Sequence, residues 1–259
     1  MPKFAANLTM LFAEVPFLER FKLASQAGFE YIEFLFPYDY KADQLANLLA
    51  ENNLQQILFN MPPGYWEDGE RGIACLPSRK EEFRAGVHKA IDYAKTLGVR
   101  QVNCLAGLRP DNVPLTVLHD TLCENICYAA EQLQNNNMTL LLEPINSRID
   151  MPGFFLDTLD KTIKIIHDVG CSNVKIQFDI YHMQVMQGDI IKSIENNLSY
   201  IGHIQFADCP GRHEPGTGEL NFENIFTSLD KLNYLGWVSA EYISKTQTAA
   251  SLAWFKTEY

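Results

Sequence analysis

The stretch TLLLEPIN occupies residues 139–146, and three similar stretches follow it: VKIQFDIYH at 174–182, IGHIQFAD at 201–208 and GWVSAEYI at 236–243. Each is a short apolar run with an acidic or amide side chain near its end. Apolar runs of this length predict strands that are buried on both faces, as in a parallel sheet. The four stretches therefore predict the second half of a parallel sheet whose strands end in polar groups.

The same alternation of a short apolar run and a longer amphipathic stretch occurs eight times along the chain. The predicted strands are Phe4–Phe12, Tyr31–Pro37, Gln55–Asn60, Gln101–Gly107, Thr139–Asn146, Val174–His182, Ile201–Asp208 and Trp237–Ile243. Apolar residues recur at helical spacing in Val15–Ala27, Glu81–Leu97 and Leu115–Leu133, which predicts helices there. No G-x-G-x-x-G motif follows the first strand, which argues against a dinucleotide-binding fold. Eight βα units in 259 residues predict a single (β/α)8 TIM barrel, one domain over residues 1–259.

Glycine precedes four of the predicted strands, and we expect it to end the helix before each one. These glycines are Gly28, Gly98, Gly170 and Gly236. Glycine readily adopts the left-handed conformation that ends many helices, so the repeated placement supports the βα units.

Two long loops follow predicted strands, Met61–Arg79 after the third and Cys209–Asn221 after the seventh. Enzymes with this barrel place their active sites at the carboxyl ends of the strands. We therefore expect both loops to cover or line such a site.

The composition excludes several classes of protein. A net charge of -11 repels phosphate backbones, so we expect no nucleic-acid partner. No window approaches the roughly 18 unbroken apolar residues of a membrane helix, and the N-terminal residues lack the pattern of a signal peptide. We therefore expect a cytoplasmic protein with no membrane partner, and the sequence leaves open whether it forms a homo-oligomer.

Six cysteines are spread along the chain, and none forms a C-x-x-C motif. Cys123 and Cys127 lie one helical turn apart, a spacing that is compatible with a metal pair. Two reduced thiols on a helix are the simpler interpretation, because a disulfide scaffold needs a denser pattern in a shorter chain.

The main indication of a site is a set of polar residues late in four consecutive strands. They are Glu143, Asp179, Gln205 and Glu241. Side chains two residues apart face the same way along a strand, so all four can point inward, above a layer of Leu141, Gln177, His203 and Ser239. Unpaired buried carboxylates are unfavourable, and a bound cation offsets this. An all-oxygen ligand set favours Mg²⁺ or Mn²⁺ over Zn²⁺.

Two further residues near this set suit contacts with a substrate. His182 lies three residues after Asp179 and can donate a hydrogen bond to a substrate oxygen. Arg212, in the loop after the seventh strand, has a planar fork that matches a carboxylate. Three other histidines lie in predicted helical stretches and are expected to be structural or solvated: His88, His119 and His167.

The chain resembles the hydroxypyruvate isomerase family, within the xylose-isomerase-like barrel superfamily. The resemblance rests on FAANLTMLF, YIEFLFPYDY, GERGIACLPSR, LLEPIN, MPGFF, IQFDIYHMQ, GHIQFAD, EPGTGELN and GWVSAEY, and it reaches from near the N-terminus to about Tyr242. The resemblance implies a metal held by Glu143, Asp179, Gln205 and Glu241. It also implies an acid/base pair, Glu143 and Glu241, and substrate contacts from His182 and Arg212. One departure is Ile243, where family members often have Lys.

The implied reaction interconverts hydroxypyruvate and tartronate semialdehyde through an enediolate. A divalent cation acts as a Lewis acid, and the two glutamates exchange protons with neighbouring carbons. Alternatives of the same class are a 2-oxo-tetronate isomerase or a sugar epimerase, and we expect Met61–Arg79 to influence the size of the substrate. An endonuclease IV-like metal nuclease shares the barrel, but such enzymes resemble basic, His-rich zinc proteins. A catalytically silent binding barrel is disfavoured because both glutamates are present.

Overall fold

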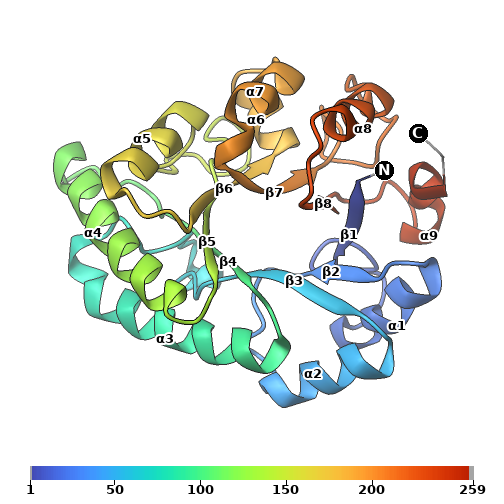
Figure 1. Cartoon of the computed structure of the whole chain (residues 1–259), viewed down its shortest axis with the longest axis horizontal. Coiled ribbons are helices and arrows are strands. Elements are labelled where there is room, and N and C mark those ends of the chain that lie inside the picture. Colours follow the sequence, from blue (N-terminus) through green and yellow to red (C-terminus); the bar gives the residue numbers. More distant parts are fainter. Residues whose placement is uncertain (1, 257–259) are drawn as a thin grey trace.

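The computed structural model describes residues 2–256 and is a (β/α)8 TIM barrel (Figure 1). Its eight parallel strands close into a ring in sequence order: β1 (Lys3–Asn7), β2 (Tyr31–Glu33), β3 (Gln55–Asn60), β4 (Gln101–Cys104), β5 (Thr139–Leu142), β6 (Val174–Asp179), β7 (Ile201–Phe206) and β8 (Trp237–Ala240). The ring closes where Ala5 of β1 lies opposite Ser239 of β8. The predicted fold class is confirmed. The ends of the predicted domain, residues 1 and 257–259, lie outside the described residues.

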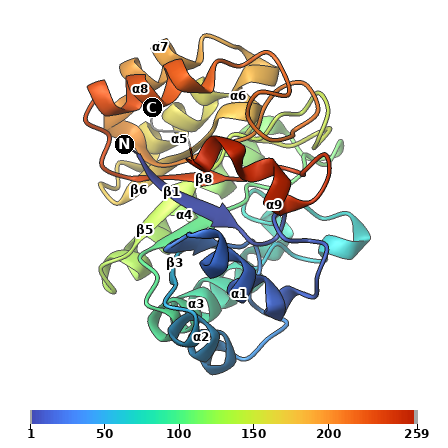
Figure 2. The same cartoon turned by 90° about the vertical axis from the view of Figure 1, so that its right-hand side faces the viewer.

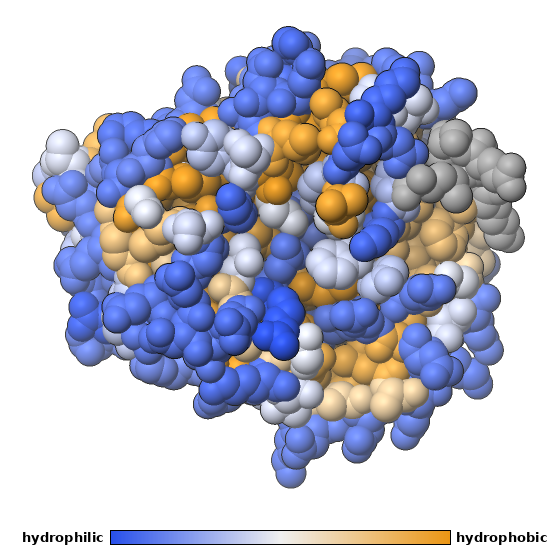
Figure 3. All heavy atoms as spheres, in the orientation of Figure 1, coloured by the Kyte–Doolittle hydropathy of each residue, from blue (hydrophilic) through white to orange (hydrophobic). Residues whose placement is uncertain are grey.

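Helices surround the ring of strands (Figure 1). They are α1 (Phe17–Ala27), α2 (Ala42–Glu51), α3 (Lys80–Leu97), α4 (Leu115–Gln134), α5 (Leu159–Val169), α6 (Ile180–Met186), α7 (Ile190–Asn197), α8 (Phe222–Lys231) and α9 (Thr248–Ser251). Short 3₁₀ turns are η1 (Trp66–Asp68), η2 (Pro77–Arg79), η3 (Leu198–Tyr200) and η4 (Leu252–Lys256). Within residues 2–256, each helix is too short or too polar to cross a membrane. The face in Figure 3 is mostly hydrophilic, with apolar side chains in scattered patches.

The apolar core has two parts. The larger part joins side chains of the strands to those of the surrounding helices. The C-terminal segment completes it beside β1 and β8 (Figure 2), where the Trp254 ring packs edge-on against Phe4 and Phe206. The smaller part is a separate cluster of four side chains, Ala5, Ile57, Leu58 and Leu141. Farther along the same strands the buried side chains are polar, so the barrel changes character toward the ends of its strands.

Several strands end earlier than the sequence predicts. β1 stops at Asn7, yet Leu8 and Leu11 in the following turn are fully buried. Such buried loop residues prolong the apolar run, so hydropathy alone overestimates strand length. Glu143 and Glu241 therefore come directly after β5 and β8 rather than within them.

The β6 region departs most from the prediction of a strand over Val174–His182. β6 ends at Asp179, and α6 begins at the next residue. The Asp179 side chain accepts a hydrogen bond from the Tyr181 backbone N–H at 2.8 Å and so caps this helix. His182 consequently lies in the first turn of a helix.

Three of the four predicted helix-ending glycines have that role, and the fourth does not. Gly28, Gly98 and Gly170 follow α1, α3 and α5 in the left-handed conformation. After α8 the left-handed residue is Asn233, with φ of 54°. A methyl group at Gly236 would lie 2.3 Å from the Tyr234 hydroxyl oxygen, so this glycine permits a close approach instead.

Asn233 gives a direct test of this correction. We expect Asn233→Ala to lower the free energy of unfolding by about 1 kcal/mol, because a Cβ without a polar group disfavours a positive φ. Asn233→Gly should match the native protein or exceed it slightly. Urea unfolding measures both changes. Asn135→Ala is the matched control, because Asn135 ends α4 with φ of -60° and should tolerate alanine. Equal losses in Asn233→Ala and Asn233→Gly would contradict this interpretation.

Candidate active site at the barrel mouth

The four polar residues predicted to form a site lie together at the carboxyl ends of the strands, here called the barrel mouth. Their exposed fractions are 5% for Glu143, 0% for Asp179, 1% for Gln205 and 2% for Glu241. Asp179 and Gln205 are direct partners in the register of β6 and β7. Gln205 Nε2 donates to Glu241 Oε1 at 3.1 Å. The cyan segment with η1 and the loop after β7 lie at the end of the barrel toward which β1 points (Figure 2).

The predicted second layer is also present, and it supports the first. Gln177, His203 and Ser239 are fully buried. Gln177 Nε2 donates to Gln205 Oε1 at 2.6 Å, so it fixes the amide of the residue above it. The network orients Gln205 with its amide nitrogen toward the carboxylates. To offer its oxygen to a cation, this amide group must turn over.

Glu33 is a fourth buried carboxylate, and the sequence analysis did not identify it. It follows Tyr31 and Ile32 in β2, and its Oε1 accepts hydrogen bonds from Asn7 at 2.9 Å and from Gln205 at 2.6 Å. Its Oε2 lies 2.7 Å from His203 Nε2. The signal was available, because an acidic residue inside the apolar run YIEF has the same pattern as the residues that were selected.

Asparagines complete the network and hold the two glutamates from different sides. Asn7 Nδ2 donates to Glu241 Oε1 at 2.8 Å. Asn103 Nδ2 donates to Glu143 Oε2 at 2.9 Å. These amides were missed because single asparagines in apolar strands carry no sequence pattern that separates them from structural residues.

Burial is the largest influence on the pKa values of these carboxyl groups. Burial and then the charge of nearby Asp179 raise the pKa of Glu143 to about 8, while Arg212 opposes the shift. Burial likewise raises the pKa of Asp179 to about 6 and that of Glu241 above its ordinary range. Burial also pushes the pKa of Glu33 upward, but neighbouring His203 and several hydrogen bonds hold it below its usual range.

Arg212 is the cation that lies against this cluster. Its Nη2 is 2.6 Å from Glu241 Oε2 and 3.6 Å from Asp179 Oδ2, and its Nη1 is 3.4 Å from Asp150 Oδ1. Its side chain is only 13% exposed, and its guanidinium lies 5.3 Å from the Tyr181 ring centroid. Burial favours loss of its proton, yet Glu241 and Asp179 hold its pKa above the ordinary value. The backbone at Arg212 has φ of 56°, an uncommon conformation that aims this side chain inward.

Asp208 orders the loop that carries Arg212. Its Oδ2 accepts hydrogen bonds from the backbone N–H groups of Gly216, Thr217 and Gly218 at 2.8–3.0 Å. Its Oδ1 accepts from those of Cys209 and Leu220. One fully buried carboxylate thus gathers both ends of the loop. Sequence reasoning placed Asp208 at the end of a strand without assigning it a role.

His182 is held as a neutral donor. Asn146 Nδ2 lies 2.7 Å from His182 Nδ1 and donates to it, which leaves the ring proton on Nε2. That nitrogen is 3.4 Å from Asp179 Oδ2 and 3.9 Å from Glu143 Oε1. Burial, followed by the charge of Arg212, lowers the pKa of His182 well below its ordinary value. Asn146 also lies 2.5 Å from Asp150, so one amide positions His182 and the acidic partner of Arg212.

The residues of the barrel mouth fit a divalent cation. Asp179 Oδ2 is a buried oxygen atom without a hydrogen-bond partner. Ligand-type atoms of Glu143, Asp179 and His182 all lie within 4.8 Å of one another. Carboxylate oxygens are the ligands that Mg²⁺ and Mn²⁺ prefer, and a cation would satisfy the unpartnered oxygen of Asp179.

Comparison with known proteins gives consistent results. The family described as "Xylose isomerase-like TIM barrel" matches residues 21–258. Hydroxypyruvate isomerase of Escherichia coli is 49% identical, covering 98% of both chains. The 2-oxo-tetronate isomerase of Cupriavidus necator is 44% identical, covering 99% of this chain and 98% of the relative.

Solved structures with the same fold carry other names. A Brucella melitensis protein named AP endonuclease, family 2, superposes with a TM-score of 0.96 at 45% identity, covering 98% of both chains. The 3-keto-D-glucoside 4-epimerase of E. coli superposes with a TM-score of 0.84 at 19% identity, covering all of both chains. At that identity the second likeness shows the fold alone.

The raised pKa of Glu143 predicts a pH dependence of stability. In the metal-free native protein this group keeps a proton that the unfolded chain releases near pH 4.5. Its stabilising contribution is therefore present at low pH and is lost as the pH rises through about 8. We expect the free energy of unfolding to fall between about pH 6.5 and about pH 8, by at most about 1.4 kcal/mol per pH unit for each proton.

Urea unfolding of chelator-treated protein measures this slope. Glu143→Gln should reduce the slope by the share of one proton, because the amide does not titrate, whereas Glu241, whose pKa is also raised, still contributes. The window begins at about pH 6.5 because His182, whose ordinary value is 6.5, opposes the trend below it. A free energy of unfolding that rises with pH in this window would be inconsistent with the assignment.

The five hydrogen bonds to Asp208 predict a local effect of its removal. Asp208→Ala leaves backbone N–H groups without their partner, each at a cost of about 1–3 kcal/mol. We expect faster hydrogen exchange across residues 209–221 with the strands still protected, because the bonds belong to the loop. Glu219→Gln, an exposed change in the same loop, is the control. Unchanged exchange in Asp208→Ala would show that other contacts order the loop.

Proposed function

Because the chain belongs to the xylose isomerase-like TIM barrel family and is a keto-acid isomerase, we propose that it interconverts hydroxypyruvate and tartronate semialdehyde. The observation that carries the proposal is the buried cluster of Glu143, Asp179 and Glu241 with Arg212 against it. The 49% identity with a hydroxypyruvate isomerase over 98% of both chains supports the choice of substrate.

The two compounds differ in which of two neighbouring carbons is the carbonyl carbon, and an enediolate connects them. In the forward direction, a base removes a proton from the hydroxymethyl carbon, and an acid returns one to the adjacent carbon. The hydroxyl proton moves to the other oxygen. Two groups are thus needed that exchange protons near neighbouring carbons, and their ideal pKa values lie near the working pH.

Glu143 and Glu241 suit these two roles. They approach the cluster from β5 and β8, and different asparagines hold them. Burial raises the pKa of both carboxyl groups, that of Glu143 to about 8 and that of Glu241 above its ordinary range. The charge of Arg212, whose Nη2 lies 2.6 Å from Glu241 Oε2, opposes this rise at Glu241. A carboxyl group that holds its proton near neutral pH can act as an acid, and after it has released the proton it can act as a base.

We propose that Glu143, Asp179, Gln205 and Glu241 hold a divalent cation, Mg²⁺ or Mn²⁺. Bound there, it would supply Lewis-acid stabilisation of negative charge that develops on the substrate oxygens. Buried carboxyl oxygens and the unpartnered Asp179 Oδ2 support the set. Gln205 joins it if its amide turns over.

Arg212 and His182 are the proposed substrate contacts. A guanidinium group binds a carboxylate through two parallel hydrogen bonds, and Arg212 already pairs with carboxylates of the chain. His182 presents its Nε2–H toward the same space that Glu143 and Asp179 face. Both side chains are held before any substrate arrives, which reduces the ordering needed on binding.

The second candidate substrate is 2-oxo-tetronate, because the relative with that name is 44% identical over nearly the whole chain. Ile243 occupies a position where members of the hydroxypyruvate isomerase family often have Lys, and its side chain is 55% exposed at the rim of the barrel.

The loop Met61–Arg79 is the proposed determinant of substrate size. An ion pair of 2.6 Å between Glu70 and Arg79 holds this loop. A turnover assay with each compound distinguishes hydroxypyruvate from 2-oxo-tetronate as the substrate.

A nuclease is not favoured, although a structure 45% identical to this chain is named as an AP endonuclease. The net charge of -11 opposes binding of a phosphate backbone. The barrel mouth is rich in carboxylates, with His182 and His203 as its histidines among the buried polar residues.

The assay that tests the proposal mixes the protein with hydroxypyruvate and, separately, with 2-oxo-tetronate, each with and without chelator. Turnover that prefers hydroxypyruvate and falls with chelator supports the full proposal. Preference for the four-carbon acid would overturn the substrate but not the chemistry. Turnover of neither acid would refute the proposed reaction.

Substitution of the two glutamates tests the acid/base scheme. We expect Glu143→Gln and Glu241→Gln each to lower kcat by about 10²–10⁴-fold, since an amide cannot exchange the proton. Steady-state kinetics at saturating Mg²⁺ measure the change. Glu223→Gln, an exposed carboxylate at the start of α8, should leave kcat unchanged. Full activity in either site variant would exclude a two-glutamate mechanism.

A further inference from the structure

A second group of ligand-type side chains lies on the outside of the barrel, where α4 lies beside α5. His119 and Cys123 are four residues apart on α4, and Asp168 lies in the last turn of α5. One ligand-type atom from each residue lies within 4.8 Å of the other two. None of the three belongs to the cluster at the barrel mouth.

The distances within this group are close to those around a bound ion. His119 Nε2 lies 2.9 Å from Asp168 Oδ2. Cys123 Sγ lies 3.9 Å from His119 Nδ1 and 4.0 Å from Nε2. Ligand atoms around a tetrahedral zinc ion lie roughly 3.3–3.8 Å apart, given bonds of about 2.0–2.3 Å. Small side-chain rotations would therefore bring all three atoms onto one ion.

The chemistry of the donors separates this group from the barrel mouth. An imidazole nitrogen, a sulfur and a carboxylate oxygen form a borderline set, which suits Zn²⁺ and Co²⁺. Mg²⁺ and Mn²⁺ prefer oxygen ligands and so favour the barrel mouth. Three protein ligands leave a further position for water.

Neighbouring charges fit such a site. Asp120 Oδ1 lies 3.4 Å from His119 Nδ1, on the ring nitrogen that the Asp168 contact leaves free. A carboxylate in this position orients a ligating imidazole. Lys164 Nζ lies 2.6 Å from Asp168 Oδ2 and balances that carboxylate when no ion is bound.

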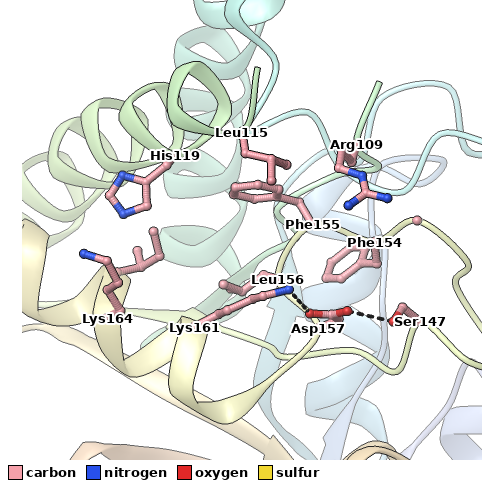
Figure 4. A pocket seen from close by; sticks show the side chains of 12 residues that line it. Arg109, Leu115, His119, Ser147, Phe154, Phe155, Leu156, Asp157, Lys161 and Lys164 are labelled. Carbon is pink, nitrogen blue, oxygen red and sulfur yellow. Dashed lines mark hydrogen bonds and ion pairs between the residues drawn. The ribbon is translucent and has the colours of Figure 1, made fainter. Parts of the chain in front are cut away.

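Figure 4 shows the pocket that His119 borders. The His119 ring from α4 and the Lys164 amine from α5 lie at the same edge of a pocket of about 480 Å³. The His119 and Asp168 side chains are 29% and 33% exposed. An ion can therefore reach them from solution, and Lys164 can move aside into water.

The Cys123 side chain suits metal binding better than nucleophilic chemistry. Burial, followed by the charge of Asp168, raises the pKa of Cys123 to about 11. The free thiol is therefore protonated at neutral pH and is a poor nucleophile. Binding of an ion forms the sulfur–metal bond and releases this proton to solvent, so the affinity must rise with pH.

We propose that His119, Cys123 and Asp168 form a second metal site, for Zn²⁺-type ions, that is independent of the barrel mouth. This set of ligands differs from the Cys123–Cys127 pair with which the sequence spacing is compatible. Cys127 Sγ instead lies 3.8 Å from the Val169 carbonyl oxygen, one turn farther along α4. An ion at the new site joins α4 to α5, and α5 follows the segment that holds Asn146 and Asp150.

Co²⁺ is the probe for this site, because a thiolate bound to Co²⁺ gives a near-ultraviolet charge-transfer band. The full chain, stripped with chelator, is titrated with Co²⁺ in the presence of excess Mg²⁺. We expect one such band that saturates at one Co²⁺ per chain and disappears when Zn²⁺ is added. Its apparent affinity should rise by up to tenfold per pH unit, because the Cys123 proton is released.

Variants show which residues hold the ion. Cys123→Ser and Cys123→Ala should abolish the band, and His119→Gln and Asp168→Asn should weaken binding at least tenfold. Cys127→Ser is the matched control and should leave the band unchanged. Circular dichroism confirms that each variant folds. The proposal is overturned if no band forms, if the band survives loss of Cys123, or if it needs Cys127. Any of these three results would leave His119 and Asp168 as a polar contact between the two helices.

Discussion

Several carboxyl groups share one water-poor space at the barrel mouth, and their mutual repulsion is the constraint on which the rest of the site depends. Glu143, Asp179 and Glu241 are almost completely buried, and Glu33 lies beside them. Burial of a charged carboxylate is unfavourable without a partner. Arg212, asparagine amide donors and His203 beneath Glu33 contact these carboxylates and offset the cost of burying them. A cation held by the same carboxylates completes this balance in the proposed function.

The same constraint explains why the polar side chains around the site are so firmly held. Arg212 reaches the carboxylates from a residue with positive φ, in a loop whose backbone is held by Asp208. His182 is fixed through Asn146, which also contacts Asp150, a partner of Arg212. Charges that oppose one another across a few ångströms thus have defined positions before a substrate binds, which is a requirement for efficient proton transfer.

The sequence anticipated the barrel and the core of its site from local pattern. Apolar runs at regular intervals predicted eight βα units, and the polar residue near the end of each late strand predicted Glu143, Asp179, Gln205 and Glu241 as neighbours. It failed at the boundaries of elements. The apolar run after Asn7 continues into a buried turn, and the run around His182 crosses from a strand into a helix. Hydropathy reports burial, whereas a strand ends where its ladder of hydrogen bonds ends.

The sequence by itself determined which strands exist and which of their residues point into the ring, because alternation along a strand is a local property of the backbone. Only the tertiary structure decided which groups touch. Glu33 meets Gln205 across 172 positions, and His119 meets Asp168 from a different helix. Such contacts depend on the closure of the barrel and on the packing of one helix against the next, and no periodicity within a segment encodes them. The direction of the Gln205 amide and the path that brings Arg212 inward were likewise set by partners distant in the chain.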